Sequence, residues 1–274
     1  MNSVSIGPSI TAGENQPLFL ISGPCVIESR ELCLKIARAL AELASTENIP
    51  LVFKASFDKA NRTSKDSYRG PGLEAGMDIL AEIKAETGLP ILTDVHTEEQ
   101  VTAVAKVCDI LQIPAFLCRQ TDLVVACGES GAVINIKKGQ FLAPKDVGHI
   151  VEKVVQTGNK NVLITERGVS FGYNNLVADM RSLVQLQEHG YPVIFDATHS
   201  VQRPGGGDGF TAGDGHLAPN LARAAVATGC QGVFIETHLN PAEAMSDKEN
   251  AIPFERMSTL WKQLSGIHGI VQAG

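Results

Sequence analysis

Residues 51–95 read LVFKASFDKANRTSKDSYRGPGLEAGMDILAEIKAETGLPILTDV and contain one complete structural unit. The apolar run at 51–55 predicts a buried strand, and the amphipathic stretch at 74–87 predicts a helix. Gly88 precedes Pro90 at the expected helix end, and residues 90–95 form a second apolar run. A strand, a helix and another apolar strand in this order indicate two parallel strands joined by a crossover helix.

The same unit repeats along the whole chain. Strands are predicted at residues 18–22, 51–55, 90–95, 110–115, 133–137, 162–166, 193–197 and 232–237, and helices at 30–45, 74–87, 97–108, 119–127, 145–156, 177–189, 218–228 and 254–264. Strands that are apolar on both faces indicate a parallel sheet covered by helices. Eight such units predict an α/β fold, a single-domain (β/α)8 TIM barrel over residues 1–274.

An open, doubly wound sheet is the alternative architecture. Such a sheet usually carries a glycine-rich dinucleotide turn after its first strand. The segment Ser22-Gly23-Pro24-Cys25 is not such a turn, so we favour the barrel. Residues 1–16 are expected to form a short extension or hairpin covering the bottom of the barrel, and the glycine-rich residues 200–216 a mobile loop beside the active site.

Composition excludes several classes of function. The 274-residue chain carries a formal charge of −7, which argues against a nucleic-acid surface. No apolar run is long enough to span a bilayer, and the first residues, MNSVSIGPSITAGENQ, do not resemble a signal peptide. Six cysteines form no CxxC pair and several lie in apolar segments, which favours the reducing cytoplasm.

Polar side chains follow every predicted strand, and many of them are cationic. Lys59, Lys137 and Arg167 come from three different strand ends, with Arg62 and Arg119 further out. Because the carboxyl ends of barrel strands meet at one mouth, these cations are expected to surround one opening. Lys and Arg with nearby hydroxyls are typical of sites for phosphate or carboxylate, although each cation alone is also consistent with a surface ion pair.

A second group combines one thiol, one imidazole and two carboxylates. Cys25, His199 and Glu236 follow the first, seventh and eighth strands, which become neighbours when the barrel closes, and Asp247 lies further along. These donor types suit a divalent transition metal. Each residue alone is equally consistent with a buried thiol, a hydrogen-bonding histidine or a carboxylate paired with a lysine.

Several motifs resemble one known family over essentially the whole chain. They are GPCVIES at residues 23–29, FKASFDKANRTS at 53–64, YRGPG at 68–72, LTDVH at 92–96, QIPAFLCRQT at 112–121, NIKKGQF at 135–141, TERG at 165–168, DATHSVQ at 196–202 and IETH at 235–238. The chain resembles the 3-deoxy-D-manno-octulosonate 8-phosphate synthases of the metal-requiring class. These enzymes condense phosphoenolpyruvate with D-arabinose 5-phosphate and water, release inorganic phosphate, and supply lipopolysaccharide biosynthesis.

The resemblance implies roles for individual residues. The expected phosphoenolpyruvate-binding residues are Lys54, Lys59, Gln112, Ala115, Phe116, Lys137 and Arg167. The expected arabinose 5-phosphate-binding residues are Asn61, Arg62, Thr63, Ser64, Arg119 and Gln202. Arg119 is expected to reach the sugar phosphate of a neighbouring subunit, which implies a homotetramer.

The resemblance also implies a metal and catalytic residues. Cys25, His199, Glu236 and Asp247 match the metal ligands, and Asp94, His199 and Cys25 the catalytic residues. Cys25 favours metal dependence because the metal-independent branch carries Asn at this position. Fe²⁺, Zn²⁺, Mn²⁺ and Co²⁺ suit these ligands about equally. The residues after Asp247 depart from the family pattern.

Three other functions compete with this one. The related 3-deoxy-D-arabino-heptulosonate 7-phosphate synthases use erythrose 4-phosphate, but they carry Lys-Pro-Arg where this chain has Ala60-Asn61-Arg62. A non-catalytic phosphosugar-binding barrel predicts the loss of at least one ligand residue, and none is lost. A metal-dependent barrel hydrolase does not need so many cations around one mouth.

Overall fold

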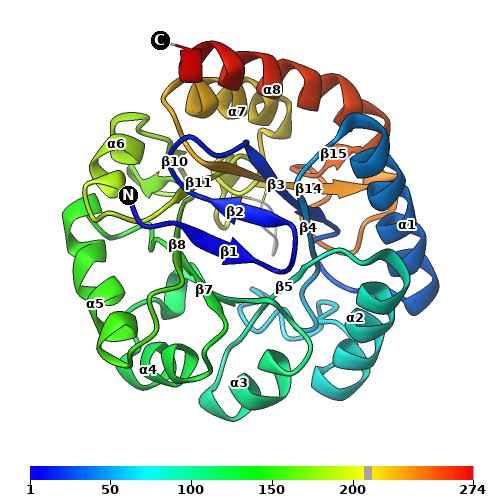
Figure 1. Ribbon diagram of the computed structural model, residues 1–274. Helices are drawn as coiled ribbons and strands as arrows, with labels where there is room; N and C mark the ends of the chain where they lie inside the picture. The colour runs from blue at the N-terminus through cyan, green and yellow to red at the C-terminus, as the bar shows by residue number, and fades with distance from the viewer. Residues whose placement is uncertain (207–211, 274) are drawn as a thin grey trace.

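The computed structural model describes residues 1–206 and 212–273, in which eight parallel strands close into a barrel ringed by helices (Figure 1). The barrel strands are β3 (Phe19–Gly23), β4 (Leu51–Lys54), β5 (Ile91–Asp94), β6 (Ile110–Ile113), β7 (Val133–Lys137), β8 (Val162–Glu166), β11 (Val193–Asp196) and β14 (Gly232–His238). Neighbours in chain order pair in parallel, and the β14–β3 pairing closes the ring. The predicted (β/α)8 barrel is confirmed.

Helices cover the outside of the barrel. They are α1 (Arg30–Glu47), α2 (Leu73–Thr87), α3 (Glu98–Ala105), α4 (Thr121–Glu129), α5 (Gly148–Gln156), α6 (Arg181–Gln187), α7 (Ala218–Ala227) and α8 (Met257–Ala273). Local signals fix both ends of α1. The Ser29 hydroxyl accepts a hydrogen bond from Leu32 N at 3.1 Å where α1 begins, and Asn48 ends that helix in the left-handed conformation, with φ of 53°.

One predicted helix was too long. The pattern predicted a helix over residues 177–189, but Leu176–Val177 (β10) pairs antiparallel with Val169–Ser170 (β9). This small hairpin follows β8, and α6 therefore begins only at Arg181. A pair of apolar residues satisfies a helical pattern and a strand pairing equally well, so the sequence did not distinguish the two.

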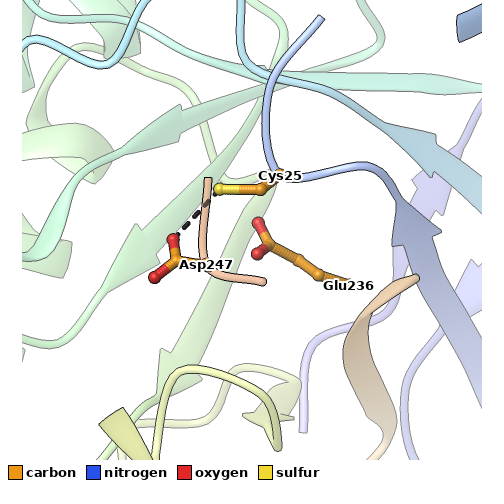
Figure 2. A group of neighbouring side chains, drawn as sticks. All are labelled: Cys25, Glu236 and Asp247. Atoms are coloured by element: carbon orange, nitrogen blue, oxygen red, sulfur yellow. Dashed lines mark hydrogen bonds between the residues drawn. The ribbon is translucent and has the colours of Figure 1, made fainter. Parts of the chain in front are cut away.

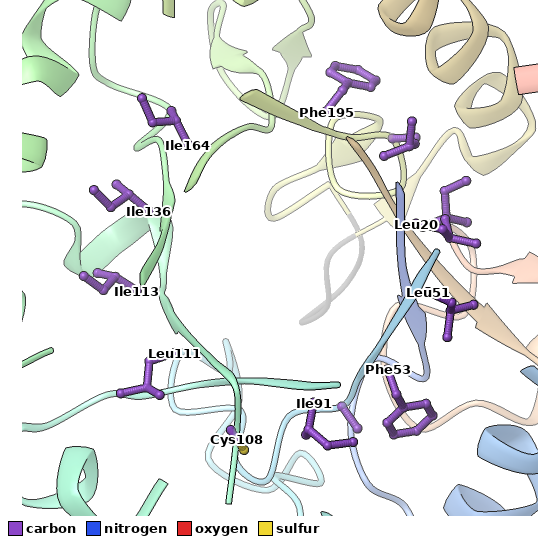
Figure 3. Close-up of a cluster of buried hydrophobic side chains, with 14 of the residues drawn as sticks. Leu20, Leu51, Phe53, Ile91, Cys108, Leu111, Ile113, Ile136, Ile164 and Phe195 are labelled. Atoms are coloured by element: carbon purple, nitrogen blue, oxygen red, sulfur yellow. The ribbon is translucent and has the colours of Figure 1, made fainter. Parts of the chain in front are cut away.

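Two layers of apolar side chains hold the barrel together. Figure 3 shows the outer layer, in which side chains such as Leu51, Ile136 and Phe195 point away from the strands toward the helices. The inner layer includes Val52 and Phe234 and continues into the N-terminal hairpin of β1 (Val4–Ile6) and β2 (Ile10–Ala12). The hairpin crosses the middle of the ring at the amino ends of the strands, which leaves polar groups to gather at the carboxyl ends (Figure 1).

The backbone of Gly23, two residues before Cys25, lies very close to the backbone of Lys54. A Cβ atom at Gly23 would lie 2.0 Å from the carbonyl oxygen of Lys54, so only glycine fits there. The β12 (Gln202–Arg203) and β13 (Ala212–Gly213) strands pair within the segment expected to be a mobile loop. That expectation covers residues 200–216 and thus includes 207–211, which lie outside the described residues. In the described part of the chain, no helix is both long and apolar enough to cross a membrane.

Candidate active site

A cavity of about 640 Å³ opens at the carboxyl ends of the barrel strands. Most predicted site residues lie in its wall: Lys59, Asn61, Arg62, Thr63, Asp94, Gln112, Ala115, Phe116, Lys137, Arg167, His199, Gln202 and Asp247. They come from loops after seven different strands or from the strand ends themselves. Closure of the barrel therefore gathers these distant residues around one opening.

Five predicted residues lie outside this wall. Cys25, Lys54 and Glu236 are buried close beneath it. The Ser64 hydroxyl accepts a hydrogen bond from Asp66 N at 3.3 Å, within its own loop. Arg119 is exposed and does not line the cavity of its own chain.

Lys137 is almost fully buried and lies among charged and aromatic groups. Its ammonium forms an ion pair with Asp196 and lies 3.4 Å from His199 Nδ1. The same ammonium is 4.0 Å from the centroid of the Phe234 ring. Burial lowers the pKa of Lys137, and Asp196 opposes that shift. Asp196 thus supplies a protein anion to this buried lysine.

Arg167 and Lys59 supply further positive charge to the cavity. Arg167 is 5% exposed and donates to Gln202 Oε1 at 2.5 Å, while its Nη1 is buried with no hydrogen-bond partner among the described residues. Burial lowers the pKa of Arg167. Burial also acts against the Lys59 ammonium, but nearby anionic groups, Glu236 and Asp94 among them, raise the pKa of Lys59. Both cations face the space that an anionic ligand would occupy.

Three potential metal ligands converge beside the cavity. One donor atom from each of Cys25, Glu236 and Asp247 lies within 4.8 Å of the others, and Figure 2 shows the three side chains pointing toward one another. The Cys25 thiol donates to Asp247 Oδ2 at 3.1 Å. The fourth predicted ligand, His199, has its Nε2 3.5 Å from Glu236 Oε1. Its Nδ1 lies 2.7 Å from Asp196, which fixes the orientation of the ring.

The electrostatics of this cluster suit a cation. Burial raises the pKa of the Cys25 thiol, and the charge of Glu236 raises it further. Burial also favours the neutral acid at Glu236, but His199 and Lys54 outweigh it and lower the pKa of Glu236. Two ionised carboxylates thus face a protonated thiol. A divalent metal would replace the thiol proton and neutralise the carboxylates, so the donor set fits such an ion.

Asp94 and His96 form a pair in the cavity wall. His96 Nε2 lies 2.9 Å from Asp94 Oδ2, and both side chains are largely buried. Burial opposes the imidazolium of His96, but the hydrogen bond and charge of Asp94 raise the pKa of His96. Asp94 Oδ1 and His96 Nδ1 have no hydrogen-bond partner among the described residues. The pair therefore holds two buried polar atoms that the described residues leave unsatisfied beside the cavity.

Ser246 connects two parts of the site. Its Oγ lies 2.9 Å from Cys25 Sγ and accepts a hydrogen bond from Arg62 Nη1, also at 2.9 Å. Arg62 Nε donates to Tyr68 O at 2.9 Å, which fixes the guanidinium over the loop that follows β4. The segment expected to bind the sugar phosphate thus touches the segment expected to bind the metal.

Sequence reasoning assigned no role to Asp196, His96 or Ser246. Asp196 and His96 stand at strand ends, a position that could have indicated a role. Ser246 has no comparable signal, because only the folded loop brings its hydroxyl against Cys25 and Arg62.

Comparison with known proteins places the chain in a family. The family model described as "DAHP synthetase I family" matches residues 2–272. The chain belongs to the DAHP synthetase I family. Within this family it is similar to the 2-dehydro-3-deoxyphosphooctonate aldolase of Geotalea daltonii, at 54% identity over 272 residues covering 99% of this chain and 100% of that protein.

Two further relatives carry the same name. That of Syntrophotalea carbinolica is 54% identical over 263 residues, covering 96% of this chain and 95% of the relative. That of an Azoarcus species is 54% identical over 263 residues, covering 95% of this chain and 94% of the relative. The similarity thus extends over nearly the whole chain.

Proposed function

We propose that the chain condenses phosphoenolpyruvate with D-arabinose 5-phosphate and water, forming 3-deoxy-D-manno-octulosonate 8-phosphate and inorganic phosphate. The observation that carries this function is the shared name of relatives more than half identical over nearly the whole chain. That name describes an eight-carbon phosphorylated 3-deoxy acid and a reaction at a carbon–carbon bond. Three carbons come from phosphoenolpyruvate, so the partner aldehyde contributes five, whereas erythrose 4-phosphate would give a seven-carbon product.

The cations of the cavity support binding of phosphoenolpyruvate. Lys59, Lys137 and Arg167 would hold its phosphate and carboxylate, with Gln112 and the Ala115–Phe116 turn shaping the pocket. The buried Nη1 of Arg167 has no partner among the described residues, which favours a ligand oxygen at that point. The Lys54 ammonium is paired with Glu236 beneath the cavity wall. Lys54 would therefore contribute positive charge from below the ligand rather than contact it directly.

The loop after β4 supports binding of the sugar phosphate. Asn61, Arg62 and Thr63 line the cavity beside Gln202, so these side chains would contact arabinose 5-phosphate. We also propose that Ser64 and Arg119 contribute, Arg119 from a neighbouring subunit. Its exposed position outside the cavity of its own chain is consistent with that role and with a homotetramer.

We propose that the enzyme belongs to the metal-dependent class. Cys25, His199, Glu236 and Asp247 would hold a divalent ion, and the convergence of a thiol with two buried carboxylates supports this assignment. When bound, the ion supplies Lewis-acid catalysis and can lower the pKa of a coordinated water.

The remaining catalytic work belongs to the side chains. The cations hold phosphoenolpyruvate so that its C3 faces the sugar aldehyde, which replaces a random encounter by an oriented one. Asp94 Oδ1 is the candidate for accepting a proton, because the two ring nitrogens of His199 would be taken by the metal and by Asp196. Asp196 keeps the His199 ring oriented through its Nδ1, at 2.7 Å. The six cysteines are buried free thiols, which supports a cytoplasmic location, where the product would enter lipopolysaccharide biosynthesis.

The choice of sugar tests this function. Purified protein should release phosphate from phosphoenolpyruvate when arabinose 5-phosphate is added, and mass spectrometry should find the eight-carbon product. Erythrose 4-phosphate should support much slower release. Faster turnover of erythrose 4-phosphate would instead favour the heptulosonate synthase.

A further inference from the structure

Three buried polar side chains connect neighbouring strands beneath the cavity. Thr165 of β8 donates from its hydroxyl to Asn135 Oδ1 at 2.6 Å. Asn135 of β7 donates from Nδ2 to Gln112 Oε1 of β6 at 3.1 Å. Thr165 and Asn135 are fully buried and Gln112 is 5% exposed, so water does not compete for these bonds. The three residues form a relay that ends at the cavity wall.

The direction of this relay follows from the Thr165 hydroxyl. An amide side chain can be reversed without changing its shape, so Asn135 and Gln112 alone do not define a direction. If both amides were reversed, Asn135 would donate to Thr165, and the buried hydroxyl proton would have no acceptor in the part of the chain that the structure describes. A buried donor without a partner is unfavourable, so Thr165 fixes Asn135, and Asn135 fixes Gln112.

The fixed direction determines which atom of Gln112 faces the cavity. Its Oε1 is used by Asn135, and its Nε2 makes no hydrogen bond within residues 1–206 and 212–273. We propose that Thr165, acting through Asn135, is a positioning residue that presents the Gln112 amide nitrogen to an oxygen of phosphoenolpyruvate. This inference rests on the proposed function.

The direction matters because of the chemistry of the ligand. At neutral pH the carboxylate and phosphate of phosphoenolpyruvate offer only acceptors. A Gln112 amide that faced them with Nε2 would donate, whereas the reversed amide would present Oε1 and repel them. Gln112 therefore aids or opposes binding of phosphoenolpyruvate according to the orientation of its amide. That orientation is set by the Thr165 hydroxyl through Asn135.

Kinetics of Thr165 variants test the proposal. Thr165→Val keeps the shape and removes the proton, so the KM for phosphoenolpyruvate should rise about tenfold, as for loss of one hydrogen bond to a charged group. The KM for arabinose 5-phosphate should stay within about twofold of the wild-type value, a smaller change than the loss of one hydrogen bond would cause. Thr165→Ser should restore wild-type values, and Thr165→Cys, with a weaker donor, should fall between Ser and Val. If Thr165→Val does not fold, the comparison of Thr165→Ser with Thr165→Cys still tests the proposal.

A double-mutant cycle separates positioning from general destabilisation. If Thr165 acts through Gln112, then Thr165→Val should add nothing to the loss caused by Gln112→Ala. Thr93→Val is the matched control, because the Thr93 hydroxyl is equally buried but donates to Ala55 O at 2.7 Å. Its effect should add to that of Gln112→Ala. An unchanged KM in folded Thr165→Val, or additive losses with Gln112→Ala, would overturn the proposal, whereas wild-type protein without turnover would overturn the proposed function instead.

Discussion

Lys54 Nζ lies 2.6 Å from Glu236 Oε1, and both side chains are almost completely buried. The same ammonium donates to the backbone oxygen of Cys25 at 2.8 Å. Lys54 therefore connects β4 to the segments that carry two candidate metal ligands. It keeps a carboxylate ionised beneath the cavity, in a position where an unpaired charge would be strongly unfavourable.

Removal of Lys54 should destabilise the metal-free protein severely. Lys54→Met leaves Glu236 without its closest cation, and we expect the free energy of unfolding to fall by about 3 kcal/mol or more. Lys84→Met is the matched control, because Lys84 pairs with Asp109 at 2.9 Å with its side chain 41% exposed, and its loss should be below about 1 kcal/mol. Urea denaturation monitored by circular dichroism measures both values. Similar losses in the two variants would contradict the importance of the buried pair.

Ser246 should tune metal binding through Cys25. Its hydroxyl contacts the Cys25 sulfur at 2.9 Å, so Ser246→Ala should weaken metal affinity about tenfold, a typical effect of removing an outer hydrogen bond. Competition with a coloured chelator measures the affinity without any activity assay. Ser246→Thr keeps the hydroxyl and should bind metal nearly as well as the wild type. Equal affinities in all three proteins would show that this contact is irrelevant to the site.

Arg167 should act mainly on phosphoenolpyruvate. Arg167→Lys retains the charge but not the two-pronged donor geometry, so we expect kcat/KM for phosphoenolpyruvate to fall at least about thirtyfold, equivalent to about 2 kcal/mol. The KM for arabinose 5-phosphate should change little. Steady-state kinetics with each substrate varied in turn will separate these effects. A larger change in the KM for the sugar would place Arg167 at the wrong end of the cavity.

His96 should make stability depend on pH. The pKa of His96 is raised by Asp94, so the folded protein holds this proton more tightly than the unfolded chain. The resulting stabilisation is complete below the ordinary histidine pKa of about 6.5, and it is lost as the pH rises through the folded-state pKa. His96→Gln should therefore flatten the fall in the free energy of unfolding as the pH rises above about 6.5. Parallel curves for variant and wild type would be incompatible with this pairing.

The sequence was sufficient for the barrel and for most of the site. Strands such as Val133–Lys137 and Val162–Glu166 were predicted with the observed bounds, because buried parallel strands are continuous apolar runs between clear stop signals. Mouth residues such as Lys59, Lys137 and Arg167 followed from strand ends, whereas Asn61 and Gln202 followed only from the resemblance to a known family. What the sequence did not show depended on pairings between distant segments: the β9–β10 hairpin replaced the start of a helix, and Lys54 is the lysine that pairs with Glu236. No local pattern records such a partner.

The most direct measurement is phosphate release from phosphoenolpyruvate by one preparation in three states: as purified, stripped with a strong chelator, and resupplied with a divalent metal. Release should require arabinose 5-phosphate, disappear on stripping and return with the metal. Full activity in rigorously metal-free protein, or release that does not need the sugar, would contradict a cavity that joins two phosphorylated substrates beside a cation.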